Sequence, residues 1–225
     1  MKILIVEDEP ELLDSIERYL SKEGNICEAS NNYKDASEKV CMYEYDCALV
    51  DIMLPDGSGL DLIDMLKREQ SKCGIIVISA KNSLNDKITG LDLGADDYIT
   101  KPFYMSELNS RVKSVIRRRV FDGNKSVSFN EIKILPDEKK VFVRDSEVSL
   151  TKKEFDILLY LISNTNRVLT KESIAEHIWG DFAESYDNFD FVYTHLKNLR
   201  KKLSDAGCKD YIKSIYGTGY KLSEE

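Results

Sequence analysis

Polar residues capable of chemistry stand at the ends of four short apolar runs. They are Glu7, Asp8 and Glu9 after the first run, Asp51 in the next, Ser79 in the third, and Lys101 with Pro102 after the last. Carboxylates brought close together repel one another unless a cation joins them. Oxygen ligands without His or Cys favour a hard ion, and Mg²⁺ keeps several waters and accepts a phosphate oxygen. The pattern therefore predicts a magnesium site that can take a phosphoryl group.

Asp51 is the residue that we expect to receive this phosphoryl group. A carboxylate can be the nucleophile and form an aspartyl phosphate, and the transfer needs mainly positioning and charge neutralisation. Lys101 would supply a positive charge for the same anion, and Ser79 would supply a hydroxyl. Each acid taken alone could instead be a solvated strand tip, with Lys101 paired to one of them. Their coincidence at matching strand ends favours chemistry.

A phosphate-handling enzyme is the competing class. Phosphatases of the haloacid-dehalogenase type carry a second Asp, acting as acid and base, two residues after the nucleophile, and here that place is Met53. Without a general acid rapid hydrolysis is disfavoured, so a phosphate on Asp51 would persist as a signal. No glycine-rich phosphate loop precedes a helix, which disfavours nucleotide hydrolysis. We expect no turnover of a separate substrate.

A parallel sheet is needed to bring these residues together. The predicted strands are 2–6, 25–30, 48–51, 74–79 and 98–100, and the predicted helices are 10–22, 33–42, 60–69, 84–93 and 105–119. Continuous apolar strands alternating with amphipathic helices predict an open, doubly wound α/β sheet of five parallel strands, covered on both faces. Such sheets place their sites at the carboxyl ends of the strands.

The second half of the chain has a different pattern. Its predicted strands are 127–129, 132–135, 140–143 and 147–150. Three predicted helices follow: the first begins at Thr151, the second covers 171–178 and the third covers 188–204. A predicted hairpin around Gly217–Gly219 ends the chain. Thr151 and Glu154 form a capping-box pattern at the start of the first helix. We expect an α/β domain over 1–119, a charged linker over 120–126 and an α+β domain over 127–225.

The helix predicted over 188–204 has two faces. Its apolar residues are Val192, Leu196, Leu199 and Leu203, and at about 100° per residue the opposite face carries Asp190, Thr194, Lys197, Asn198 and Lys201. A helix held by its apolar side can enter a major groove, where Lys meets guanine or phosphate and Asn reads adenine. The hairpin behind it would form a wing, with Lys213, Ser214, Tyr216, Thr218 and Lys221.

Charge is compatible with this interpretation. The chain carries a net charge of −8, but segment 195–221 is locally basic, which favours a polyanionic partner. A solvated helix face could carry the same charges. With 42% hydrophobic and 32% charged residues over 225 positions, the chain is typical of two globular domains. The scattered cysteines indicate reduced thiols in the cytoplasm, and no apolar run approaches the roughly 20 residues of a membrane span.

Four motifs resemble the receiver domain of two-component response regulators: VEDE at 6–9, LVDIMLPDGSG at 49–59, VISAK at 77–81 and GADDYITKPF at 94–103. The resemblance implies a flavodoxin-like fold and phosphorylation by a partner histidine kinase. It implies Mg²⁺ bound by Asp8, Asp51 and the backbone carbonyl of Met53, with Glu7 acting through water. Lys101 would bind the phosphate, and the Lys101–Pro102 bond would be cis.

The same resemblance implies a switch and a dimer. Ser79 would move toward the phosphate while Tyr98 turns inward, because a new anion attracts a hydroxyl and the vacated space accepts a ring. The positions that match charged dimer contacts of one subfamily are Lys87, Asp96, Asp97, Glu107 and Arg111. Ser114 stands where that subfamily usually has a base. An ordinary solvated surface would also carry these charges.

The second half resembles the winged-helix effector domain of the OmpR/PhoB subfamily, through LTKKEFDILLYL at 150–161, HLKNLRKKL at 195–203 and YGTGYKL at 216–222. The resemblance implies binding to direct-repeat promoter DNA, and contact with RNA polymerase if the chain is an activator. The subfamily often has Arg at three positions that are Asp190, Asn198 and Tyr216 here. We therefore do not expect this chain to make the subfamily's DNA contacts at those positions. A phosphorylation-independent regulator is a third possible class, against which the complete acid, Ser and Lys set argues.

Overall fold

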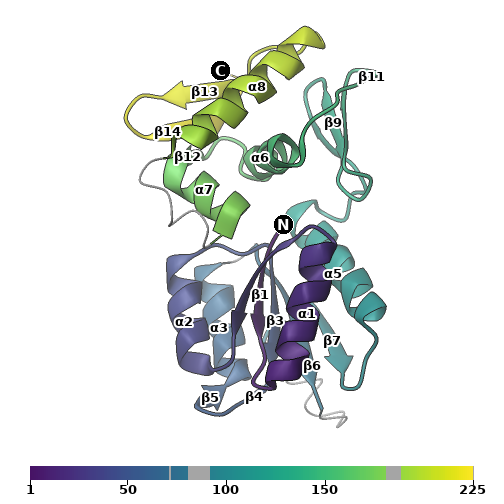
Figure 1. The fold of residues 1–225 in the computed structure, drawn as a ribbon, viewed down its shortest axis with the longest axis vertical. Helices are drawn as coiled ribbons and strands as arrows, with labels where there is room; N and C mark the ends of the chain where they lie inside the picture. Colours follow the sequence, from purple (N-terminus) through teal and green to yellow (C-terminus); the bar gives the residue numbers. More distant parts are fainter. Residues whose placement is uncertain (71, 81–91, 181–188, 225) are drawn as a thin grey trace. The chain divides into compact units, whose positions relative to one another are not determined.

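The computed structural model describes residues 1–70, 72–80, 92–180 and 189–224 (Figure 1). The chain divides into two compact units, Met1–Gly123 and Asn124–Glu225. The division lies within 120–126, the segment for which the sequence predicts a linker. Most of the predicted helix 84–93, and with it Lys87, lies outside the described residues. No helix in the described ranges is long and apolar enough to cross a membrane.

The first unit is built on a five-stranded parallel sheet with strand order β2-β1-β3-β6-β7 (Figure 1). Its strands are β1 (Lys2–Val6), β2 (Ile26–Ser30), β3 (Cys47–Asp51), β6 (Gly74–Ser79) and β7 (Asp97–Thr100). Every residue of β1, β3 and β6 is buried, as expected for central strands covered on both faces. This order confirms the predicted doubly wound sheet.

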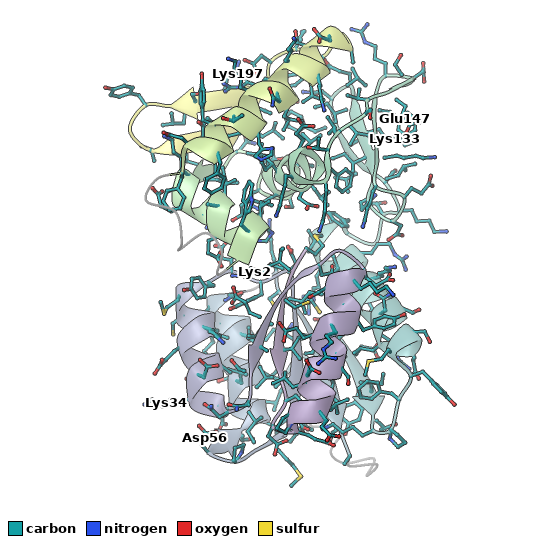
Figure 2. The ribbon with its side chains drawn as sticks, in the orientation of Figure 1. Lys2, Lys34, Asp56, Lys133, Glu147 and Lys197 are labelled. Atoms are coloured by element: carbon teal, nitrogen blue, oxygen red, sulfur yellow. The ribbon has the colours of Figure 1, made fainter. Side chains whose placement is uncertain are left out.

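Lys2, labelled in Figure 2, is the unexpected residue of this sheet because its side chain is completely buried at the start of β1. Its Nζ lies 2.8 Å from Glu28 Oε1 on the neighbouring strand β2. The same ammonium lies 4.4 Å and 4.6 Å from the ring centres of Tyr43 and Tyr45, and the Tyr45 hydroxyl donates to Glu28. A buried charge is therefore paired with both a carboxylate and aromatic rings.

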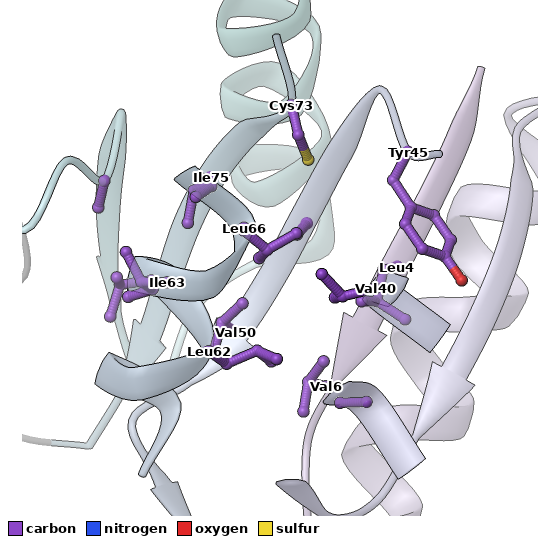
Figure 3. Packing of buried hydrophobic residues seen from close by; sticks show 14 of the residues in the cluster. Leu4, Val6, Val40, Tyr45, Val50, Leu62, Ile63, Leu66, Cys73 and Ile75 are labelled. Carbon is purple, nitrogen blue, oxygen red and sulfur yellow. The ribbon is translucent and has the colours of Figure 1, made fainter. Parts of the chain in front are cut away.

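Four described helices cover the sheet: α1 (Pro10–Lys22), α2 (Tyr33–Met42), α3 (Gly59–Glu69) and α5 (Met105–Val120). Because strand side chains alternate between faces, Val50 and Ile75 point to one face, where they meet Leu62, Ile63 and Leu66 of α3 (Figure 3). The sequence did not predict a two-stranded ribbon directly after β3, formed by β4 (Met53–Leu54) and β5 (Gly57–Ser58).

The second unit begins with a four-stranded antiparallel sheet in the order β11-β10-β9-β8. Its strands are β8 (Val127–Phe129), β9 (Ile132–Leu135), β10 (Lys140–Val143) and β11 (Ser146–Glu147). The fourth predicted strand is present, but its bounds are Ser146–Glu147 and not 147–150. Pairing ends where Val148 N donates to Val141 O at 2.8 Å, because the chain then turns into the helix cap at Thr151.

The rest of the second unit contains three described helices and a small sheet. They are α6 (Lys152–Ser163), α7 (Lys171–Trp179), α8 (Asp190–Asp205), β12 (Val168–Thr170), β13 (Ile212–Ile215) and β14 (Gly219–Leu222). The capping box is confirmed, since Glu154 N donates to Thr151 Oγ1 and Thr151 N donates to Glu154 Oε2. The sequence did not predict β12, which joins the hairpin in the order β12-β14-β13. Here β13 and β14 are called the wing.

Candidate metal centre and nucleic-acid interface

Glu7, Asp8 and Asp51 lie together at the carboxyl ends of two adjacent strands. One carboxylate oxygen from each residue lies within 4.8 Å of the others. The parallel pairing of β1 with β3, which sets Val6 opposite Val50, brings the three acids to one edge of the sheet. Glu7 and Asp51 are 0% and 4% exposed, whereas Asp8 is exposed to solvent. The predicted acidic cluster is therefore present, with two buried members and one accessible member.

Lys101 connects two of these acids. Its Nζ lies 2.6 Å from Glu7 Oε1 and 2.6 Å from Asp51 Oδ2. Burial raises the pKa of the Glu7 carboxyl, although its hydrogen bond with Lys101 acts in the opposite direction. Burial also acts to lower the pKa of Lys101, but the hydrogen bonds to Asp51 and Glu7 outweigh it and leave that pKa raised. A single ammonium thus serves two buried carboxyl groups.

The cluster fits a hard divalent cation. Glu7 Oε2 is buried and accepts no hydrogen bond from any residue that the structure describes, while Oε1 is held by Lys101. Three carboxylates beside one lysine leave an excess of negative charge that a cation would balance. All the donor atoms are oxygens, which Mg²⁺ prefers over nitrogen or sulfur. Glu7, Asp8 and Asp51 could therefore hold such an ion.

The ribbon β4–β5 holds the backbone beside Asp51. Met53 N donates to Asp51 Oδ1 at 2.9 Å, and Gly59 N donates to Ile52 O at 3.0 Å. A Cβ on Gly59 would lie only 2.0 Å from Asp51 O, so the chain can pass this point only as glycine. The Met53 side chain is 58% exposed. The loop thus fixes the backbone next to Asp51 while its Met53 side chain points to solvent.

Asp56 is a residue of this loop that the sequence did not indicate. Its Oδ1 accepts from Tyr33 N at 2.7 Å and its Oδ2 from Lys34 N at 3.0 Å, at the first turn of α2 (Figure 2). These hydrogen bonds lower the pKa of Asp56. A Cβ on Gly57 would lie 2.6 Å from Tyr33 Cγ, so the loop backbone also packs closely against the Tyr33 side chain. Proline, aspartate and glycine at 55–57 indicate only a turn, and no local signal reveals so distant a partner.

Ser79 and Tyr98 lie on neighbouring strands near Lys101. Ser79 is completely buried at the end of β6, and its carbonyl accepts from Lys101 N at 2.9 Å. Tyr98 on β7 is half-buried and packs against the core cluster on the α2 and α3 face. The Lys101–Pro102 peptide bond is cis, as the resemblance implied.

The described residues of the predicted dimer set form ion pairs within one chain. Arg111 Nη1 lies 3.0 Å from both carboxylate oxygens of Asp97, and its Nη2 lies 2.8 Å from Glu107 Oε1. Asp96 pairs instead with Arg119, at 2.5 Å. These acids are therefore already neutralised by bases of their own chain.

Helix α8 has the two predicted faces. Val192, Leu196, Leu199 and Leu203 are buried, whereas Asp190, Thr194, Lys197, Asn198 and Lys201 are exposed. Figure 2 labels Lys197 on the exposed face. Two other bases are engaged within the unit, because Lys202 Nζ lies 2.7 Å from Glu154 Oε2 and Arg200 reaches the wing. The exposed face thus keeps Lys197 and Lys201 as its positive charges.

The wing places its predicted residues in different surroundings. Tyr216 is fully exposed at the tip, and Thr218 is exposed beside it. Lys213 Nζ donates to the backbone carbonyl of Asp210 at 2.8 Å. Ser214 is exposed, and its hydroxyl accepts from the Arg200 guanidinium at 3.1 Å.

Comparison with known proteins agrees with this architecture. Residues 3–113 match the family model of the response regulator receiver domain, and residues 145–222 match that of the transcriptional regulatory protein C-terminal domain. The response regulator ArlR of Staphylococcus haemolyticus is 38% identical over 97% of both chains. The regulatory protein VanR of Enterococcus faecium is 39% identical over 99% of both chains.

A solved structure from a family of redox sensors in the streptococci, evolved from two-component response regulators, is 26% identical, with a TM-score of 0.50. It covers 100% of this chain and 99% of its own. The receiver sheet with its acidic edge, the helices and wing of the second unit, and these matches agree. The chain belongs to the response regulators of two-component systems, with an N-terminal receiver domain and a C-terminal transcriptional regulatory domain of the OmpR/PhoB type.

Proposed function

We propose that phosphorylation of Asp51 switches this regulator between two states of DNA binding. A sensor histidine kinase would donate the phosphoryl group in the cytoplasm. The observation that carries this proposal is the position of Asp51, whose Oδ2 lies 2.6 Å from Lys101 Nζ beside two further acids. A nucleophilic carboxylate needs this combination of acids that can hold a cation and a lysine that can receive the new anion.

Mg²⁺ is the proposed cofactor. Asp8, Asp51 and the backbone carbonyl of Met53 would bind it, and Glu7 would act through water. When bound, the ion would shield the carboxylates and neutralise charge on the incoming phosphoryl group. Lys101 would then exchange its contact with Glu7 for a phosphate oxygen, since the transferred group brings more negative charge to Asp51.

We further propose that Ser79 and Tyr98 report the phosphate to the surface formed by β7 and α5. Ser79 would donate its hydroxyl to the phosphate, and Tyr98 would turn inward from its half-buried position. Asp97, Glu107 and Arg111 lie on this surface, and a homodimer formed through it would bring two C-terminal domains to adjacent sites on direct-repeat promoter DNA. RNA polymerase would be a further partner if the chain is an activator.

Helix α8 and the wing are the proposed DNA-binding elements. Thr194, Lys197, Asn198 and Lys201 would face the major groove, while Tyr216 and Thr218 at the wing tip, with Lys213 and Ser214 on β13, would lie over the neighbouring backbone. The exposure of the α8 residues, opposite a face of buried leucines, supports this orientation. No turnover of a separate substrate is proposed, because Met53 offers no general acid beside Asp51.

The test is incubation of the full chain with Mg²⁺ and acetyl phosphate, followed by intact mass, sedimentation and DNA mobility-shift measurements. We expect one added phosphoryl group, a larger dimer fraction and tighter DNA binding, all lost in Asp51→Asn. Absence of an Asp51-dependent modification would refute the switch. Continuous hydrolysis of phosphoesters would instead favour an enzyme, and DNA binding indifferent to Asp51→Asn would favour a phosphorylation-independent regulator.

A further inference from the structure

Arg200 differs from Lys197 and Lys201 of the same helix because its side chain does not lie on the exposed face of α8. It follows the buried Leu199, and only 27% of its side chain is exposed to solvent. The next residue, Lys201, is exposed. Two adjacent bases of the same helix therefore have different surroundings, and they need not have the same role.

The Arg200 guanidinium contacts the wing at several points. Its Nη2 donates to the backbone carbonyl of Ile212 and, at 3.1 Å, to the hydroxyl of Ser214. Its Nε lies 3.6 Å from Asp210 Oδ1, just before β13. The guanidinium carbon lies 5.9 Å from the centre of the Tyr220 ring on β14. A single side chain thus reaches both strands of the wing and the segment that leads into it.

These contacts attach an edge strand of the wing to α8. Among the strands that the structure describes, the sheet order β12-β14-β13 makes β13 an edge strand that pairs with β14. Arg200 gives β13 a second attachment, which runs to α8. The planar guanidinium suits this role because it offers several donors in a fixed arrangement and stacks on aromatic rings, whereas a lysine ammonium is a single point charge.

We propose that Arg200 is a positioning residue that fixes the wing relative to α8, and that it is not a DNA phosphate contact. The effect of Arg200 on DNA binding rests on the proposed DNA-binding function. The contacts of Arg200 with the wing are present in the free protein and can be tested without DNA. Without Arg200 the ladder between β13 and β14 would remain, but the wing would lose its orientation relative to α8. Contacts made by Tyr216 at the wing tip would then no longer add to those made by α8.

The first test needs no DNA. Amide hydrogen exchange of residues 212–222 is measured in the full chain and in Arg200→Gln, with Ser214→Ala as a milder variant should Arg200→Gln fail to fold. We expect exchange in the wing to become about tenfold faster in Arg200→Gln, with the α8 amides unchanged, because charged hydrogen bonds that hold the strand are lost. The matched control Lys201→Ala should leave wing exchange unchanged. Unaltered wing exchange in Arg200→Gln would overturn the proposal.

The second test is a double-mutant cycle on DNA, with a duplex that the phosphorylated chain has selected from a random pool. Tyr216→Ala should weaken binding in the wild-type background and in Lys201→Ala, but should have almost no further effect in Arg200→Gln, since the wing is no longer held there. Additive losses for Arg200→Gln and Tyr216→Ala would show independent contacts and overturn the proposal. Failure of the unaltered chain to bind any duplex would refute the proposed function. The exchange test would still decide whether Arg200 fixes the wing relative to α8.

Discussion

Asp56 Oδ1 accepts a hydrogen bond from the backbone N–H of Tyr33 at 2.7 Å, although the two residues are far apart in sequence. The other oxygen of the same carboxylate accepts from Lys34 N. Free N–H groups at a helix start attract a carboxylate, so α2 holds the loop that follows Asp51. The consequence is that the geometry beside Asp51 depends on a helix that contributes no side chain to the acidic cluster.

Asp56→Ala should slow phosphorylation of Asp51. The loop that carries Met53 would lose its attachment to α2 and be held less firmly, and a displacement of about 1 Å near reacting groups can cost up to about a hundredfold in rate. The measurement is the rate of modification by acetyl phosphate as a function of Mg²⁺ concentration. We expect a loss of about tenfold that is largest at low Mg²⁺.

Asn32→Ala is the matched control for that experiment, because Asn32 Oδ1 caps the same end of α2 by accepting from Asp35 N at 2.9 Å and, within the described residues, forms no hydrogen bond with the loop. This variant should lose stability but keep its phosphorylation rate. Equal slowing in Asp56→Ala and Asn32→Ala would mean that Asp56 acts only as a helix cap.

Lys2→Met should destabilise the receiver domain by about 3 kcal/mol or more, because it leaves the buried Glu28 carboxylate without its ion partner. The double variant Lys2→Met with Glu28→Gln should recover most of this loss. Unfolding of this domain can be followed by labelling of Cys47 and Cys73, which are 0% and 1% exposed. Equal stability of the single and double variants would contradict the paired role of Lys2.

Glu131 should stabilise the C-terminal domain in a pH-dependent manner. Hydrogen bonds from Lys209 N and the Tyr211 hydroxyl lower its pKa to about 2. A lowered pKa in the folded state means that the carboxylate stabilises the fold above about pH 4, its unfolded value, and that this contribution is lost as the pH falls toward 2. Glu131 is only partly buried, so added salt should reduce the effect.

The measurement is the urea midpoint of wild type and Glu131→Gln, read from the fluorescence of Trp179, the single tryptophan of the chain. We expect Glu131→Gln to unfold at lower urea at pH 7, and the difference between the two proteins to shrink steadily as the pH falls from about 4 toward the folded pKa of about 2. A gap in urea midpoint between the two proteins that grows as the pH falls would contradict the prediction.

Lys201→Ala and Asn198→Ala should affect DNA binding differently. A lysine that neutralises a phosphate contributes to all sequences, and its loss should reduce the slope of log affinity against log salt by about 0.9. An asparagine that reads a base edge should lower the preference for the selected duplex over a scrambled one, with little change in slope. Equal losses on both duplexes for both variants would refute this division.

The sequence predicted those features that depend on local patterns. Continuous apolar runs predicted β1 and β6 with the bounds that the structure has, because central strands bury both faces. The alternation of strands with helices predicted the acidic edge. It could not predict the partners of Asp56 or Lys2, because each lies on another element and no local periodicity encodes it. The sequence did not predict β12 at 168–170 for the same reason, since these residues form a strand only by pairing with β14 much later in the chain.

The sharing of Arg111 between Asp97 and Glu107 has a thermodynamic consequence for any association through the β7 and α5 surface. Both acids already have a basic partner within the chain, so intermolecular ion pairs at these positions would replace existing ones without increasing their number. The enthalpy and the salt dependence of such an association would therefore be small. Its free energy would come chiefly from the apolar area that is removed from water, with a negative heat-capacity change as its signature.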